Sequence, residues 1–339
     1  MPHVYLSIEL YGVELRFGSR LKMIGIVLAL VTVLAGVAYV SFRRDLALQY
    51  ERVGKGSHVI DSPFGVIEYA LQGQGPTMLA LHGSGGGFDQ GIEFAEPFLR
   101  SGFQVLAQSR FGYLRSSFPA DPSPTRQADA LAHLLQKLRI EKVIAVAASA
   151  GAHSALELAL RHPHLLSALI LIVPSAYHPG TAATPHFGPA MLAILKVAFR
   201  SDFLFWAALK LAPDRMVRMI LATDPELVRR QPKDEQRHAR NTLWHILPVS
   251  LRSRGLLADA DTASRLAPCP LETITVPTLT VSAPDDFYGT YPAAQYVAQC
   301  VANGRFVGFA DGGHVLVGRG GELKQAMLRF LEEQTVRMA

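Results

Sequence analysis

The stretch Lys142-Val-Ile-Ala-Val-Ala-Ala-Ser-Ala-Gly-Ala-His-Ser154 decides how this chain folds. It begins with the short apolar run 143–146, which is too brief for a helix and reads as a strand buried on both faces. Small residues then surround Ser149, and a helical pattern of apolar residues follows from Ala152. The stretch therefore predicts a strand that turns abruptly into a helix, with a serine at the turn.

Such a turn is the setting of a nucleophile elbow, whose pattern is G-x-S-x-G. Ala147 replaces the first glycine, which adds one methyl group to a crowded position, while Gly151 keeps the second. The N–H groups at the start of the following helix favour a developing negative charge beside Ser149. The pentapeptide alone is equally compatible with a serine in an alanine-rich turn of any doubly wound fold.

A glycine-rich loop, His82-Gly-Ser-Gly-Gly-Gly87, follows the apolar strand 77–81. It lacks the lysine of a phosphate-binding loop and the spacing of a dinucleotide fingerprint, so a nucleotide site is not predicted. Further along, short apolar strands alternate with amphipathic helices, as in 103–108 followed by 122–138. This alternation predicts a doubly wound, mostly parallel sheet.

Two later strands end in chemically useful loops. The strand 277–281 leads to Ser282-Ala-Pro-Asp-Asp286, and the strand 305–309 leads to Asp311-Gly-Gly-His314. A carboxylate after one strand and a histidine after the next would complete a triad in the chain order serine, acid, histidine. Lone Asp and His residues in loops are more often only solvated, so the order of the three loops carries the prediction.

Together these motifs resemble the α/β-hydrolase family of serine hydrolases, esterases and lipases, over residues 57–177 and the C-terminal part. The resemblance implies a nucleophile at Ser149, a base at His314 and an acid at Asp285, with the adjacent Asp286 as the alternative. It also implies an oxyanion hole formed by the backbone N–H groups of Ser84 and Ala150.

Other positions depart from the family or serve it structurally. His82 is interpreted as a structural histidine that orders the glycine-rich loop rather than as a base. Ser109-Arg-Phe-Gly-Tyr-Leu-Arg-Ser116 resembles the family loop D-x-R-G-x-G-x-S, but Ser109 replaces its aspartate and Leu114 its second glycine. A serine at position 149 argues against the epoxide hydrolases and haloalkane dehalogenases of this fold, which place an aspartate at the elbow.

The N-terminus carries an uncharged apolar run, residues 23–42, flanked by basic residues on both sides. About 20 such residues are long enough to span a bilayer, so we expect a single-pass anchor. A cleaved signal segment is the alternative, and it would make the protein exported. Basic residues at both ends leave open which side of the membrane the catalytic domain faces. Residues 1–22 are an unusual leader, and Met23 is an alternative start.

The remaining division is a stem over 43–56, an α/β-hydrolase core over 57–177 and 271–339, and a helical cap over 178–270 inserted before the acid strand. The cap sequence is rich in Phe, Met, Trp and Leu, which favours a substrate with an apolar acyl or alcohol group. Its basic stretch 229–240 is interpreted as a solvated helix face, with anionic lipid headgroups as the alternative.

The composition limits the classes of ligand and partner that this protein is expected to bind. The net charge of +5 is spread rather than clustered, so no nucleic-acid surface is expected. Cys269 and Cys300 have no metal-like spacing, and no motif predicts a metal or any other cofactor. We expect a small ester substrate, lipid-like in character, and a membrane contact through residues 23–42. The sequence leaves the oligomeric state open.

The expected function is hydrolysis of a carboxylic ester through an acyl-enzyme on Ser149. The same triad also serves amide, thioester and carbon–carbon bond hydrolysis, and the motifs do not separate these reactions. A binding module that keeps the fold without catalysis is the alternative from another class, and the departures at Ala147, Ser109 and Leu114 keep it open.

Overall fold

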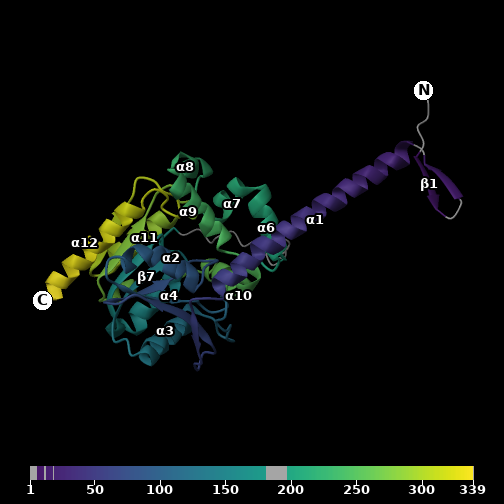
Figure 1. The fold of residues 1–339 in the computed structure, drawn as a ribbon. Coiled ribbons are helices and arrows are strands. Elements are labelled where there is room, and N and C mark those ends of the chain that lie inside the picture. The colour runs from purple at the N-terminus through teal and green to yellow at the C-terminus, as the bar shows by residue number, and fades with distance from the viewer. Residues whose placement is uncertain (1–5, 11–12, 18, 181–196, 339) are drawn as a thin grey trace. The chain divides into compact units, whose positions relative to one another are not determined.

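The structure, a computed structural model, describes residues 6–10, 13–17, 19–180 and 197–338 (Figure 1). Its main feature is an eight-stranded sheet with the strand order β10-β9-β8-β7-β5-β6-β4-β3. The six neighbouring strands β6, β5, β7, β8, β9 and β10 are parallel to one another. Strand β4 pairs antiparallel with β6 on one side and with β3 on the other. The prediction of a mostly parallel sheet of the α/β-hydrolase type is confirmed.

The elements follow the order expected from the sequence. The strands are β3 His58–Ile60, β4 Ile67–Gln72, β5 Thr77–Leu81, β6 Gln104–Gln108, β7 Val143–Ala148, β8 Leu166–Ile172, β9 Thr278–Ser282 and β10 Gly304–Gly308. The helices that flank them are α2 Phe88–Leu99, α3 Pro124–Leu138, α4 Gly151–Arg161, α11 Thr290–Cys300 and α12 Gly320–Met338. Helix α2 begins at Phe88, directly after the glycine-rich loop.

The sheet is buried on both faces, and alternate side chains of its strands enter two separate cores. In β5, Leu79 and Leu81 pack with helices α3, α4 and α11, whereas Met78 and Ala80 pack with α2 and α12. This explains why the strands read as continuous apolar runs rather than as alternating ones. The loops that carry the predicted site residues follow the carboxyl ends of parallel strands, so the fold gathers these loops at one edge of the sheet.

Helices α6 Asp202–Leu211, α7 Pro213–Ile220, α8 Pro225–Arg230, α9 Lys233–Trp244 and α10 Ser253–Ala263 lie between β8 and β9. They occupy the region predicted as a helical cap, of which residues 181–196 lie outside the described residues. Several of their apolar side chains are buried but belong to neither of the two sheet cores, among them Phe205, Trp206 and Leu209. The predicted core and cap boundaries stay a prediction.

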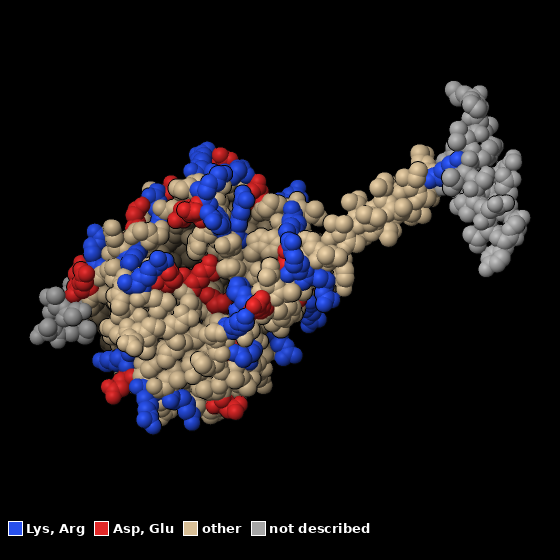
Figure 2. Space-filling view, viewed as in Figure 1, with Lys and Arg blue, Asp and Glu red and all other residues tan. Residues whose placement is uncertain are grey.

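The N-terminal part forms a separate compact unit, Met1–Gln49, and the second unit is Tyr50–Ala339. The first unit holds the antiparallel strands β1 Leu6–Leu10 and β2 Val13–Phe17 and most of helix α1, Ser19–Val53. Helix α1 continues without a break through the predicted boundary between span and stem. In Figure 2 its middle carries no Lys, Arg, Asp or Glu, and its apolar side chains there are exposed.

Within the described residues, one helical segment, Lys22–Val53, is long and apolar enough to cross a membrane. The length and composition of this segment also fit a signal sequence near the N-terminus. The choice between an anchor and a cleaved signal therefore stays a prediction.

Candidate active site

Ser149 lies between β7 and α4 and adopts a left-handed backbone conformation, with φ of 51°. A non-glycine residue in this region costs about 1–3 kcal/mol and persists only where the surroundings hold it. Here the Ser149 amide donates to the Ile172 carbonyl at 2.9 Å, and the Ser175 amide donates back to the Ser149 carbonyl at 3.1 Å. The predicted strand–serine–helix turn is confirmed, with a strained serine at its tip.

The small residues around Ser149 have separate structural reasons. A Cβ at Gly151 would lie 2.5 Å from the Leu81 carbonyl oxygen, so only glycine fits there. Ala147, in contrast, is fully buried in one of the two cores, where its methyl group is accommodated. The elbow therefore tolerates its departure from the G-x-S-x-G pattern at the first position but not at the second.

His314, in the loop after β10, meets Ser149. Its Nε2 lies 2.8 Å from Ser149 Oγ. Its backbone N–H donates to Thr223 Oγ1 at 3.0 Å, and the ring packs edge-on against Tyr288 with 4.8 Å between centroids. Ser149 and His314 are 165 positions apart in the sequence, and the structure brings them together as the chain order predicted.

The carboxylate beside His314 belongs to Asp286, so the prediction of Asp285 as the acid is wrong and the alternative holds. Asp286 Oδ2 lies 2.9 Å from His314 Nδ1, and its side chain is fully buried. The carboxylate of Asp285 instead accepts the amides of Gly312 and Gly313, at 3.2 and 3.0 Å. After β9 the chain closes a turn in which the Asp286 amide donates to the Ala283 carbonyl. The two successive carboxylates therefore point at different parts of the histidine loop.

The surroundings of Asp286 favour its ionised form. Burial by itself raises the pKa of this carboxyl, but hydrogen bonds and charge from His314, the Thr290 hydroxyl and the Tyr288 amide outweigh burial and lower it. The Tyr288 amide donates to Asp286 Oδ1 at 2.8 Å. A charged, fixed carboxylate is what a histidine needs to keep one tautomer and to carry a proton transiently.

The loop that begins at His82 lies against Ser149, since a Cβ at Gly83 would be 3.2 Å from Ser149 Cβ. The Gly83 amide donates to Gln90 Oε1 at 3.0 Å. The amides of Ser84 and Ala150 have no hydrogen-bond acceptor among residues 19–180 and 197–338. These two amides stay the predicted oxyanion donors.

His82 has the structural role expected of it. It is fully buried, its Nδ1 contacts the Gly83 carbonyl at 2.7 Å, and its Nε2 accepts the Arg110 amide at 3.0 Å. Burial, assisted by the nearby Arg110 charge, lowers the pKa of this histidine to about 3. A histidine that stays neutral and contacts the backbone through both ring nitrogens orders the loop.

A buried ionic cluster behind this loop was not found from the sequence. The guanidinium of Arg110 donates to both carboxylate oxygens of Asp259 at 2.6 and 2.7 Å. The hydroxyls of Tyr113 and Ser84 donate to the same carboxylate, the latter at 2.9 Å. Burial raises the pKa of Asp259, but the Arg110 charge prevails and lowers it to about 2. Arg110 and Tyr113 lie in the quoted 109–116 loop, whereas Asp259 on α10 has no local signal.

The departure at Ser109 also has a partner. Its hydroxyl donates to Glu68 Oε2 at 2.9 Å and accepts the Phe88 amide at 3.0 Å. Glu68 is fully buried on β4 and is paired with Arg115 at 2.6 Å. A carboxylate from a neighbouring strand thus takes the place where the family loop has an aspartate of its own.

Thr223 is another site residue without a sequence signal. It lies between α7 and α8, is fully buried, donates to the Leu221 carbonyl at 2.7 Å and accepts the amide of His314. The insertion between β8 and β9 therefore helps to position His314. In the part of the chain that the structure describes, no group of three or more His, Cys, Asp or Glu side chains is arranged to hold a metal ion.

Residues 76–318 match the family model described as the alpha/beta hydrolase fold, which covers more than half of the chain. The chain belongs to this family. The family assignment agrees with the elbow, the histidine loop and the eight-stranded sheet described above.

Two curated relatives are hydrolases. The chain is 28% identical over 140 residues to the 2-hydroxy-6-oxo-6-phenylhexa-2,4-dienoate hydrolase of Comamonas testosteroni, which is 40% of this chain and 47% of that protein. It is 31% identical over 137 residues to the 2-hydroxy-6-oxononadienedioate/2-hydroxy-6-oxononatrienedioate hydrolase 2 of Pseudomonas putida, which is 38% of this chain and 40% of that protein. The matches span less than half the length of either relative.

A solved structure of a bacterial membrane phospholipase A is also similar, with a TM-score of 0.63 and 22% identity. The similarity covers 93% of this chain and 99% of that one. At this identity it demonstrates a shared fold. The family match, together with the curated relatives, identifies this chain as a hydrolase of the α/β-hydrolase type.

Proposed function

We propose that this protein is a serine hydrolase that cleaves a carboxylic ester through an acyl-enzyme on Ser149. The observation that carries the proposal is the continuous contact from Ser149 Oγ through the His314 ring to the Asp286 carboxylate. These three side chains come from three separate loops, and their contact geometry is the one required for activating a hydroxyl nucleophile.

The chemistry follows from the two contacts of the histidine. His314 Nε2 takes the hydroxyl proton as Ser149 Oγ attacks the ester carbonyl carbon, and the imidazolium is stabilised by Asp286. When the tetrahedral intermediate collapses, the carbon–oxygen bond to the alcohol breaks and His314 protonates the leaving oxygen. Water then attacks the acyl-enzyme by the same route, which releases the carboxylic acid and restores the hydroxyl of Ser149.

Negative charge on the carbonyl oxygen would be held by the amides of Ser84 and Ala150. Each such donor lowers the barrier by about 3–4 kcal/mol in serine hydrolases. Ala150 supports this role because it immediately precedes helix α4, whose N-terminus favours negative charge. Ser84 supports it because its side chain is tied to Asp259 while its amide has no acceptor among the described residues.

An apolar acyl or alcohol group is proposed for the substrate. The insertion between β8 and β9 contacts the histidine loop through Thr223, and it exposes Phe203, Leu204 and Leu211 as well as burying an apolar interior. Helix α1 is proposed as a membrane anchor, which would give the enzyme access to lipid-like esters.

Carbon–carbon bond hydrolysis is the second candidate. It is favoured by the two curated relatives, whose names describe hydrolases of 2-hydroxy-6-oxo dienoates. Both reactions need the same nucleophile and base, so the two candidates are separated by comparing turnover of p-nitrophenyl esters with turnover of a vinylogous 1,5-diketone acid.

Labelling by a fluorophosphonate probe tests the proposal, with the wild type beside Ser149→Ala and His314→Ala. We expect a labelled band for the wild type alone, in the membrane fraction, because only an activated serine attacks the phosphorus atom. A soluble labelled protein would contradict the anchor. A folded wild type that stays unlabelled, with and without detergent, would favour a non-catalytic binding module.

A further inference from the structure

The last turn of α1 belongs to the same compact unit as the candidate active site, Tyr50–Ala339. Val53 is buried there, and the Arg52 guanidinium contacts two other segments of the unit. Its Nη1 pairs with the carboxylate of Asp89, and its Nη2 donates to the carbonyls of His245 and Leu247 at 2.9 and 3.1 Å. One side chain thus joins the start of α2 to the insertion between β8 and β9.

Asp89 connects this contact to the glycine-rich loop. It lies in the first turn of α2, directly after the loop residues 83–87, and its side chain is 7% exposed. Arg252, whose side chain is fully buried, pairs with Asp89 at 2.8 Å and also donates to the carbonyl of Gly86. The Asp89 carboxylate is therefore shared by two guanidinium groups, one of which holds the loop itself.

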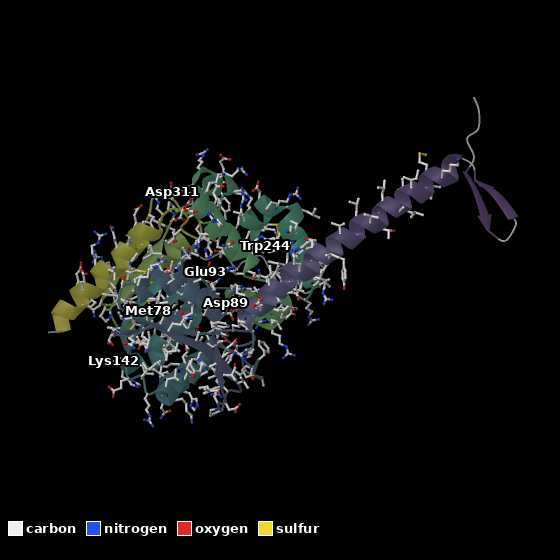
Figure 3. The ribbon with its side chains drawn as sticks, in the orientation of Figure 1. Met78, Asp89, Glu93, Lys142, Trp244 and Asp311 are labelled. Atoms are coloured by element: carbon white, nitrogen blue, oxygen red, sulfur yellow. The ribbon has the colours of Figure 1, made fainter. Side chains whose placement is uncertain are left out.

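The segment 245–252 lies directly on the same loop. A Cβ at Gly85 would be 3.2 Å from Ile246 Cγ1, and Gly85 has a positive φ of 82°. His245 Nδ1 lies 2.8 Å from the carboxylate of Glu93 on α2. Figure 3 labels Asp89 and Glu93 on α2, and Trp244, after which this segment begins. The position of the loop thus depends on how firmly the segment is held against α2.

Arg52 differs from the other contacts in what it binds. Arg252 already supplies one positive charge to Asp89, so neutralising that carboxylate does not require Arg52. The fork of a guanidinium can bind a carboxylate and two carbonyls at once, which a lysine ammonium does with poorer geometry. The specific contribution of Arg52 is therefore to fix three chain segments relative to one another.

We propose that Arg52 is a positioning residue for the glycine-rich loop. It holds the segment 245–252 against the start of α2, and Asp89 and Arg252 transmit this constraint to Gly86. The inference rests on the proposed function, because Arg52 would act by placing the Ser84 amide where it binds the oxyanion in the transition state. Small displacements of a catalytic donor reduce turnover by up to about 100-fold, even when the altered residue is remote.

The test measures kcat and KM with p-nitrophenyl butyrate on the full chain in detergent, normalised to sites titrated by a fluorophosphonate. Arg52→Ala should lower kcat about 10- to 100-fold with little change in KM, because the loop acts on the transition state. Arg52→Lys should fall between this variant and the wild type. About 20 mM guanidinium, far below concentrations that unfold proteins, should restore part of the Arg52→Ala activity.

Lys55→Ala is the matched control, since Lys55 lies three residues away and its one ion pair within the described residues is with the exposed Glu51. It should keep the wild-type kcat. A lower melting temperature of Arg52→Ala with an unchanged kcat per titrated site would refute the inference and leave a purely structural role. If Arg52→Ala does not fold, an unchanged kcat of Arg52→Lys refutes it instead. A folded wild type that neither labels nor turns over esters refutes the proposed function, and this inference with it.

Discussion

The side-chain clusters around Ser149 and around Asp259 both touch the loop that begins at His82, and they differ in how they are built. The cluster of Ser149, His314 and Asp286 comes from three loops at the ends of parallel strands, and its members face one another in a chain. The cluster of Arg110 and Asp259 is a buried pair whose donors converge on one carboxylate. In the proposed function the first arrangement moves a proton, whereas the second holds the loop in place, so variants of the two should fail in different ways.

The largest effect is expected at the carboxylate of the first cluster. Asp286→Asn should reduce kcat by about 10,000-fold, because the amide favours the wrong histidine tautomer and cannot stabilise the imidazolium. Asp285→Asn is the matched control on the neighbouring residue and should lower kcat less than about tenfold, since among the described residues the Asp285 carboxylate accepts two amides of the histidine loop. Steady-state kinetics decide the matter. An Asp285 variant as inactive as the Asp286 variant would overturn the assignment of the acid.

The second cluster should respond in stability. Asp259→Asn leaves Arg110 buried without its counter-charge, so the free energy of unfolding should fall by about 3–5 kcal/mol at neutral pH. Denaturant unfolding measures this loss. Asp261→Asn on the same helix is the control, because Asp261 pairs with Arg265 at the surface and should contribute less than about 1 kcal/mol.

The stability loss of Asp259→Asn should also depend on pH. The pKa of Asp259 is lowered to about 2 in the folded protein, so its stabilising contribution is present above the unfolded value of about 4 and is lost as the pH falls toward the folded value. The stability difference between wild type and Asp259→Asn should therefore shrink between about pH 4 and pH 2. A difference that stays constant over this window would contradict an ionic origin.

The smallest effect is expected at the elbow itself. Ala147→Gly restores the family pattern but removes a buried methyl group and loosens a central strand, so stability should fall by about 1 kcal/mol. Turnover should change little, because Gly151 and the backbone of Ser149 are untouched. Thermal unfolding and kinetics check this. A more stable variant would mean that the Ala147 methyl strains the turn.

Part of the site was predictable because it is encoded locally. The turn around Ser149 and the loop before His314 each follow a recognisable strand, and parallel strands deliver their carboxyl ends to one edge. The resemblance points to Asp285, with Asp286 as the alternative, but a family spacing cannot show which of two successive side chains turns toward the histidine. That choice depends on the turn closed by the Asp286 amide and the Ala283 carbonyl.

The sequence by itself determined the fold class, the order of the motifs and the apolar N-terminal helix, because strand periodicity and tight turns depend on neighbouring residues. Only the tertiary structure decided which groups meet over long separations. Asp259 with Arg110, Thr223 with His314 and Arg52 with Asp89 are pairs of this kind. The residues of each pair lie 37 to 149 positions apart, and such contacts leave no periodic trace because they depend on how elements distant in the sequence pack together.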